Sequence, residues 1–230
     1  MKRKTQRSLA SMVPIIGLLL SGFLMSCSIL ASITSSVPTA PTGVTVTGTT
    51  CTAIEVNWTP VSGASSYTVY YTDDGTTPSE GTNTGYFDSI SAPPYTFIPD
   101  SNASPIQVAV SATNNNGEGN ISSIVTGSPL APANITVTVD TGTTTDTFAL
   151  TWAPVAGAAT YTVYRSLAAS ESQLTAPNYS STNPYNTSNT SCHWNVSSSN
   201  LEDYFEFAVA GVDSAGNIGP LSPVSTPLQP

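Results

Sequence analysis

Cys192 and His193 are neighbours, which makes them the first candidate for chemistry in this sequence. His193 is the single histidine among 230 residues. A histidine-based metal cluster is therefore excluded, and any nucleophilic triad would depend on this one base. Neighbouring residues on a strand point to opposite faces of a sheet, so the thiol and the imidazole are expected to diverge. The sequence predicts neither a Cys-His nucleophile nor a metal site.

Adjacent acidic residues could supply a general acid and a general base. They occur as Asp73-Asp74 and Glu202-Asp203. Catalytic carboxylates must converge on one substrate atom, whereas neighbours on a strand diverge, and in loops such residues more often form turns. The sequence has no Asp-rich calcium loop and no Gly-rich phosphate loop. We therefore expect a protein that is not an enzyme and needs no cofactor.

The distribution of charge limits the partners of this protein. From Cys27 onward, fourteen acidic residues stand against Arg165 alone, a formal net charge of −13. A protein that binds nucleic acid neutralises phosphates with clustered Lys and Arg, and a polybasic membrane contact needs the same cluster. Both kinds of partner are excluded.

The N-terminus has the layout of an export signal. Residues 1–7 are basic, residues 9–24 are mostly apolar, and Leu24-Met25-Ser26-Cys27 ends the segment with a small residue before a cysteine. This ending resembles the lipobox of bacterial lipoproteins, in which the cysteine receives a thioether-linked diacylglycerol and the chain is cut just before it. The resemblance implies a signal peptide over 1–26, a membrane anchor at Cys27 and a lipidated tether over 27–38.

Two other interpretations of this N-terminus stay open. The apolar stretch continues to Ile33, which is long enough for an uncleaved membrane-spanning helix. Ordinary signal peptidase could instead cut near Ala31. All three interpretations place the rest of the chain outside the cytoplasm. In the lipoprotein interpretation, Ser28 stands where some bacteria use aspartate to hold lipoproteins at the inner membrane, which favours the outer membrane.

An internal repeat organises the rest of the chain. Residues 54–70 recur at 148–164 with the same Trp-x-Pro-Val-x-Gly-Ala and Tyr-Thr-Val-Tyr motifs. Apolar residues within each copy recur with a period of two, as at Ile54, Val56 and Trp58, which is the pattern of a strand with one buried face. Short alternating strands separated by Gly, Pro, Asn and Asp clusters predict an antiparallel β-sandwich for each copy.

These motifs, together with the later runs at 108–114 and 207–217, resemble the fibronectin type III domain. The resemblance implies an all-β fold with two tandem immunoglobulin-like sandwiches, the first over 39–128 and the second over 129–230. The fold hosts adhesion, spacing and ligand-binding roles alike, so it does not specify a function.

The topology of this family suggests a position for Cys51 and Cys192. It places the loop that holds Cys51 at the pole of the first copy next to the second copy, and Cys192 just after a loop at the near pole of the second. An interdomain disulfide is one hypothesis, because an exported compartment favours its formation. The alternative is two independent thiols, since Cys192 shares strand parity with Trp194 and Val196 and would then face its own core.

Residues 70–78, Tyr-Tyr-Thr-Asp-Asp-Gly-Thr-Thr-Pro, resemble a hairpin of small sandwich domains appended to chitobiase-like and other exported carbohydrate-active proteins. The structural interpretation is a tight turn at Asp74-Gly75. The functional one is a sugar-binding surface on which exposed aromatic rings stack. The candidate contact residues outside the main buried pattern or in loops are Tyr70, Tyr86, Tyr179 and Tyr185.

Residues 165–189 form a long polar passage that the first copy lacks, and long connections are more often functional than short ones. Any ligand is expected there or at the turns 114–120 and 213–219. We expect a non-catalytic lipoprotein of the bacterial cell envelope that binds a protein or matrix partner or acts as a spacer. The alternative is a carbohydrate-binding accessory lipoprotein with a glycan ligand.

Overall fold

The computed structural model describes residues 36–80, 85–100, 105–140, 147–181, 183–197, 200 and 202–230. A compact unit extends from Val37 to Pro230. The predicted signal peptide, Cys27 and the tether up to residue 35 lie outside the described residues. Among the residues that are described, no helix is long and apolar enough to cross a membrane.

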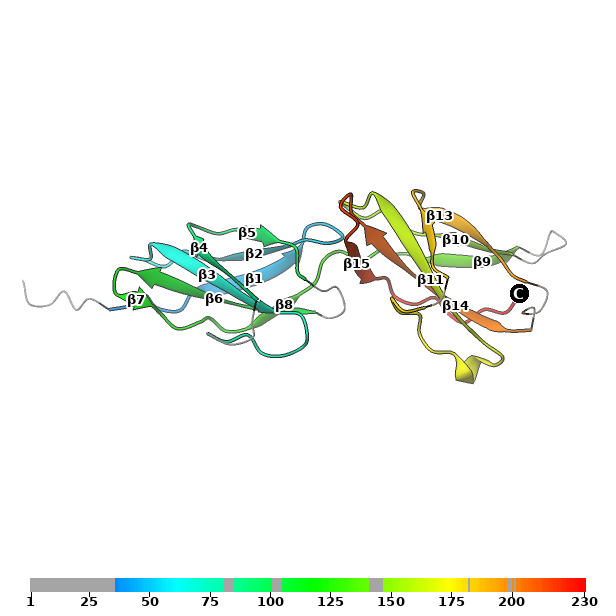
Figure 1. The fold of residues 1–230 in the computed structure, drawn as a ribbon, viewed down its shortest axis with the longest axis horizontal. Helices are drawn as coiled ribbons and strands as arrows, with labels where there is room; N and C mark the ends of the chain where they lie inside the picture. Colours follow the sequence, from blue (N-terminus) through cyan, green and yellow to red (C-terminus); the bar gives the residue numbers. More distant parts are fainter. Residues whose placement is uncertain are drawn as a thin grey trace, which may run out of the picture. The chain divides into compact units, whose positions relative to one another are not determined.

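The first sandwich consists of two antiparallel sheets (Figure 1). One sheet has the order β1-β2-β5, and the other has the order β4-β3-β6-β7, with β8 also paired to β6. The strands are β1 (Thr42–Gly48), β2 (Ile54–Thr59), β3 (Ser66–Thr72), β4 (Gly85–Ile90), β5 (Tyr95–Phe97), β6 (Ile106–Asn114), β7 (Gly117–Glu118) and β8 (Val125–Gly127).

The second sandwich repeats this arrangement, with sheets of order β13-β10-β9 and β12-β11-β14-β15. Its strands are β9 (Thr136–Asp140), β10 (Thr147–Thr151), β11 (Thr160–Ala168), β12 (Tyr185–Thr187), β13 (Ser191–Asn195), β14 (Tyr204–Val212) and β15 (Ile218–Leu221). A 3-10 turn, η1 (Glu171–Gln173), lies in the connection from β11 to β12, the yellow segment of Figure 1. The chain is therefore all-β, with two fibronectin type III-like sandwiches in tandem.

The period-two pattern explains how the two sheets of each sandwich pack. In β2, Ile54, Val56 and Trp58 are buried, whereas Glu55 and Asn57 are half-buried and exposed. Side chains of this parity fill one core in each sandwich. Burying such side chains is the main favourable term in folding. The repeat seen in the sequence is thus a repeat of the core.

The repeated Trp and Tyr have the same role in both copies. The rings of Trp58 and Tyr67 lie 5.2 Å apart, and Tyr67 Oη accepts a hydrogen bond from the Val61 N–H at 2.8 Å. In the second copy, the rings of Trp152 and Tyr161 lie 5.6 Å apart, and Tyr161 Oη accepts from the backbone N–H six residues before it at 3.0 Å. Each tyrosine thus ties the connection after the tryptophan strand to the core.

Strands β3 and β11 depart from simple alternation. Tyr67–Thr72 and Tyr161–Tyr164 are buried at every position, so the outward face of each strand is covered as well. In the second sandwich, Tyr179 from the β11–β12 connection packs edge-on against the outward ring of Tyr164, with centroids 5.8 Å apart. The connection therefore folds back over the sheet.

Candidate functional site

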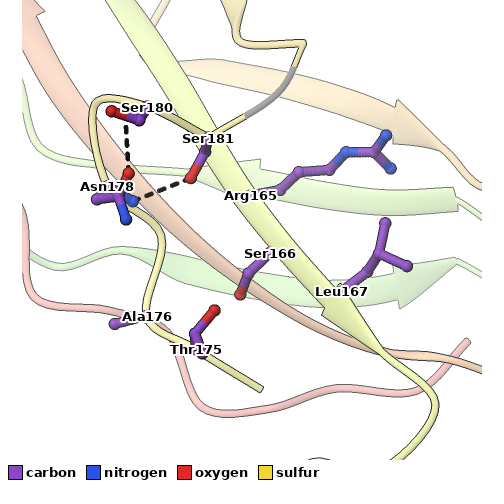
Figure 2. Close-up of a pocket in the computed structure, with 8 residues that line it drawn as sticks. All are labelled: Arg165, Ser166, Leu167, Thr175, Ala176, Asn178, Ser180 and Ser181. Carbon is purple, nitrogen blue, oxygen red and sulfur yellow. Dashed lines mark hydrogen bonds between the residues drawn. The ribbon is translucent and has the colours of Figure 1, made fainter. Parts of the chain in front are cut away.

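The β11–β12 connection, residues 169–184, forms a cleft with strand β11. Its volume is about 370 Å³. The residues that line it carry mostly hydroxyl and amide side chains: Arg165, Ser166, Leu167, Thr175, Ala176, Asn178, Ser180 and Ser181. Figure 2 shows Ser166 on the side of the connection, whereas the side chains of Arg165 and Leu167 project from the other side of the strand. The cleft lies in the polar passage that the sequence singled out.

A turn at residues 178–181 shapes one end of the cleft. Asn178 N–H donates to Ser181 Oγ at 3.0 Å, and Asn178 Oδ1 accepts from the Ser180 N–H at 2.9 Å (Figure 2). On the strand side, Ser166 Oγ is buried and has no hydrogen-bond partner among the described residues. A buried hydroxyl without a partner is uncommon in folded proteins. The cleft thus offers hydroxyl and amide groups to a small polar ligand.

Tyr179 was expected to be a ligand-contact residue, but its hydroxyl and its ring both make contacts within the protein. Its hydroxyl donates to the Gly219 carbonyl oxygen at 3.0 Å, and its ring covers Tyr164. Burial raises the pKa of Tyr179. This tyrosine pins the β11–β12 connection to the sheet and leaves only part of its ring exposed.

Tyr185 is more open, with 45 % of its surface exposed. Its ring lies edge-on to the indole of Trp194, with centroids 6.3 Å apart. The guanidinium carbon of Arg165 lies 4.7 Å from the centroid of the same indole. Three side chains from β11, β12 and β13 therefore meet at one place. The sequence shows Arg165 as the one basic residue after Cys27, but it does not predict the contact between Arg165 and the Trp194 ring.

Tyr70 and Tyr86 pair across β3 and β4 in the first sandwich, with ring centroids 6.3 Å apart. Tyr86 is 62 % exposed, as a contact residue should be, whereas Tyr70 is only 7 % exposed. Tyr70 Oη donates to Glu118 Oε1 at 2.6 Å, and Ser111 Oγ donates to the same oxygen. The interpretation of Tyr70 as an exposed sugar platform is therefore wrong, because neighbouring strands cover it.

The partner of Tyr70 was not predicted. Burial and the hydrogen bond to Glu118 both raise the pKa of Tyr70. Glu118 lies on β7, which pairs with β6, so it reaches the outer face of the sheet only after the chain turns at 114–117. The sequence carries no signal for this contact, because the residues are 48 positions apart.

Cys51 and Cys192 are two free, buried thiols. Cys192 pairs with Leu150 across β13 and β10 and belongs to the second core, together with Val196. Burial raises its pKa to about 11. The disulfide hypothesis is therefore wrong for this structure, and the alternative of independent thiols is the arrangement observed. The parity of Cys192 with the core residues of its own strand is the reason.

Cys51 lies in the loop between β1 and β2, and this loop contacts the second sandwich. Its N–H donates to the Ala156 carbonyl oxygen at 2.8 Å, and Leu130 N–H donates to the Thr50 carbonyl oxygen at 2.8 Å. Thr52 Oγ1 donates to Asp213 Oδ2 at 3.0 Å. We call these contacts of loop 49–53 the junction. Although no bridge forms, the sequence had placed Cys51 on the side of the second copy, and the contacts agree.

The remaining candidate catalytic residues do not come together in one site. His193 is exposed on the strand face opposite to Cys192. Asp74 accepts hydrogen bonds from Thr76 N–H and Oγ1 at 2.9 and 2.6 Å, and these bonds lower its pKa. Gly75, with φ of +83°, completes the turn that the sequence predicted. In the described ranges, no three His, Cys, Asp or Glu side chains are placed to hold a metal ion.

Comparison with protein-family models and with curated proteins finds no match. Several solved structures are similar to parts of the chain. A segment of two fibronectin type III domains from chicken tenascin is 14 % identical over 85 % of this chain and 100 % of its own, with a TM-score of 0.37. A Fn3-like protein from Clostridium thermocellum is 24 % identical over 40 % of this chain and 92 % of its own, with a TM-score of 0.34.

The FN1-FN3 domains of chicken CNTN1 are 18 % identical over 85 % of this chain, with a TM-score of 0.34. This chain spans 66 % of their length. All of these scores are low for the chain as a whole. The fibronectin type III-like arrangement therefore rests on the strand order and the two cores described above.

Proposed function

We propose that this chain is a lipid-anchored, non-catalytic protein of the bacterial cell envelope. Its two sandwiches act as a spacer that carries a protein- or matrix-binding surface outside the cytoplasm, at the outer membrane. The anchor is the lipid on Cys27, and residues 28–38 link it to the first sandwich. The export signal and the lipobox resemblance support the anchor, and the acidic, lysine-free surface after Cys27 suits an exposed, soluble module.

The observation that carries the spacer function is the junction. Two backbone hydrogen bonds and one side-chain hydrogen bond join loop 49–53 to residues 130, 156 and 213. A flexible Gly/Ser-rich linker would leave two domains free to reorient, whereas backbone hydrogen bonds at a packed contact restrict them. A spacer needs this restriction, because it must hold a binding surface at a defined place relative to its anchor.

Close packing at the junction supports the same function. A Cβ added at Gly219 would lie 2.0 Å from the Cys51 carbonyl oxygen, and one added at Gly211 would lie 2.9 Å from Cys51 Cβ. Only glycine permits so close an approach of the loop at these positions. The second sandwich is therefore shaped to receive the loop of the first.

Protease shaving of intact cells tests the proposed location. We expect peptides from residues 40–230 to be released while a periplasmic control protein stays intact. Release only after the envelope is broken would overturn the exposed binding surface. Cys27→Ser is the companion variant, and it should lose metabolic palmitate labelling and leave the membrane fraction. A Cys27→Ser protein that stays in the membrane fraction would indicate an uncleaved helix instead of a lipid anchor.

A further inference from the structure

Arg165 is a cation on an acidic protein, and among the described residues it has no acidic partner. It is the only Lys or Arg from Cys27 onward, against fourteen acidic residues. Nevertheless, within the described part of the chain its guanidinium makes no ion pair and no hydrogen bond, and its one specific contact is the Trp194 ring. An arginine carries five N–H donors in a planar fork that matches a carboxylate. Arg165 is half-buried, and no described residue accepts a hydrogen bond from these donors.

Trp194 fixes the orientation of this fork. The guanidinium carbon lies 4.7 Å from the indole centroid, a favourable cation–π distance. The indole is itself held in the second core by an aromatic contact with Phe207, at 6.0 Å between centroids. A held arginine loses less side-chain entropy when it binds a ligand than a free one would. The arrangement is therefore preorganised for an anion.

Tyr185 adds an exposed aromatic ring to the same indole. Its ring lies edge-on to Trp194, with centroids 6.3 Å apart, and 45 % of its surface is exposed. An acidic peptide side chain would use the guanidinium alone. A sugar acid would use both groups, because the apolar C–H face of a pyranose packs on an aromatic ring while its carboxylate accepts the N–H donors.

We propose that Arg165, Trp194 and Tyr185 form a binding site for a saccharide that carries a single carboxylate, such as one hexuronic acid residue in an otherwise neutral glycan. The net charge of −13 from Cys27 onward argues for one carboxylate, because a polyanionic chain would be repelled by the rest of the surface. The site depends neither on the lipid anchor nor on the junction. A negative result for saccharide binding would therefore leave the proposed spacer function unaffected, and the reverse also holds.

Nuclear magnetic resonance of residues 37–230, the compact unit, tests this site directly. Arg165 is the only arginine in that range, so its Nε–H signal is unique. The probes are methyl glucuronide, its methyl ester and methyl glucoside. We expect the glucuronide to shift the Arg165 Nε–H and Trp194 indole signals saturably, with the ester and the glucoside at least about tenfold weaker. Equal binding of all three sugars, or no saturable shift, would overturn the proposal.

Variants separate the site from its alternatives. Arg165→Gln should abolish the preference for the carboxylate, and Tyr185→Ala should weaken glucuronide binding about threefold to tenfold through lost stacking. Ile98→Ala removes an exposed apolar side chain of the first sandwich and should leave binding unchanged. Acetate or an acidic peptide that shifts the same signals as strongly as the glucuronide would show an adventitious anion or a peptide site, and either result contradicts the saccharide. Dispersed spectra of each variant confirm that it is folded.

Discussion

Thr52 and Asp213 are 161 positions apart in the chain, and a 3.0 Å hydrogen bond from Thr52 Oγ1 to Asp213 Oδ2 joins them. The same carboxylate accepts from the Ala215 and Asn217 N–H groups and from Asn217 Nδ2, each at 2.9 Å. One acidic side chain therefore both shapes the turn after β14 and receives the loop of the first sandwich. Local turn chemistry and long-range contact depend on the same atoms.

Asp213→Ala should loosen both the turn and the junction. It leaves three N–H donors and the Thr52 hydroxyl without their acceptor, so we expect a loss of about 1–3 kcal/mol in the free energy of unfolding. Urea unfolding followed by tryptophan fluorescence measures it. Asp74→Ala is the control, because it removes a turn carboxylate whose side-chain hydrogen bonds, among the described residues, come from Thr76. Equal losses for the two variants would contradict a role at the junction.

The contribution of Asp213 should depend on pH. Desolvation opposes its ionisation, but hydrogen bonds from Asn217, Thr52 and Ala215 outweigh it and lower the pKa of this carboxyl below the ordinary value of an aspartate. A lowered pKa in the folded state means that the stabilisation is present above the unfolded pKa and is lost as the pH falls through the folded one. The difference in Tm between the native protein and Asp213→Asn should therefore shrink below about pH 4. A constant difference at lower pH would contradict this assignment.

Gly219→Ala should disturb the junction by a steric clash. Its Cβ would lie 2.0 Å from the Cys51 carbonyl oxygen, so the two sandwiches must separate locally, at a cost of about 1–3 kcal/mol. Gly119→Ala is a matched control, because it creates the same 2.0 Å clash with the Pro38 carbonyl oxygen, away from the junction. Residual dipolar couplings should show freer interdomain motion in the Gly219 variant only. Unchanged couplings in both variants would contradict the spacer.

The thiols of Cys51 and Cys192 should resist alkylation in the folded protein. Burial raises the pKa of both groups, to about 11 for Cys192, so little thiolate is present near pH 8. Iodoacetamide followed by intact mass measurement on residues 37–230 should find no adduct in the native state and two adducts in denaturant without reductant. Failure to alkylate until a reductant is added would instead indicate the disulfide.

Tyr70→Phe should destabilise the first sandwich by about 1–2 kcal/mol, because it removes a hydrogen bond to the Glu118 carboxylate. Tyr86→Phe should have no measurable effect, since Tyr86 is the exposed member of the pair. Thermal unfolding of both variants checks this difference. A neutral Tyr70→Phe would mean that Tyr70 is not the structural residue that its burial indicates.

Local patterns were sufficient for the strands, the duplication and the inward parity of residues such as Val56 and Cys192. Period-two alternation is a property of neighbouring residues, and a strand with one buried face expresses it directly. The turn at Asp74-Gly75 was predictable for the same reason, because the bonds that Asp74 Oδ1 accepts come from Thr76, two residues further along the chain. The all-β fold class is therefore encoded in local sequence.

Burial on the outer faces of the sheets depended instead on the tertiary structure. Tyr70 and Tyr164 have the parity of exposed residues, yet they are covered because distant segments carrying Glu118 and Tyr179 fold over them. The pairing of Arg165 with Trp194 likewise requires β11 and β13, which belong to different sheets, to come together. Such contacts join residues that are far apart in the chain, and no local periodicity encodes them. The amino-acid pattern thus specified two sandwiches, and their packing decided which side chains remain free to bind.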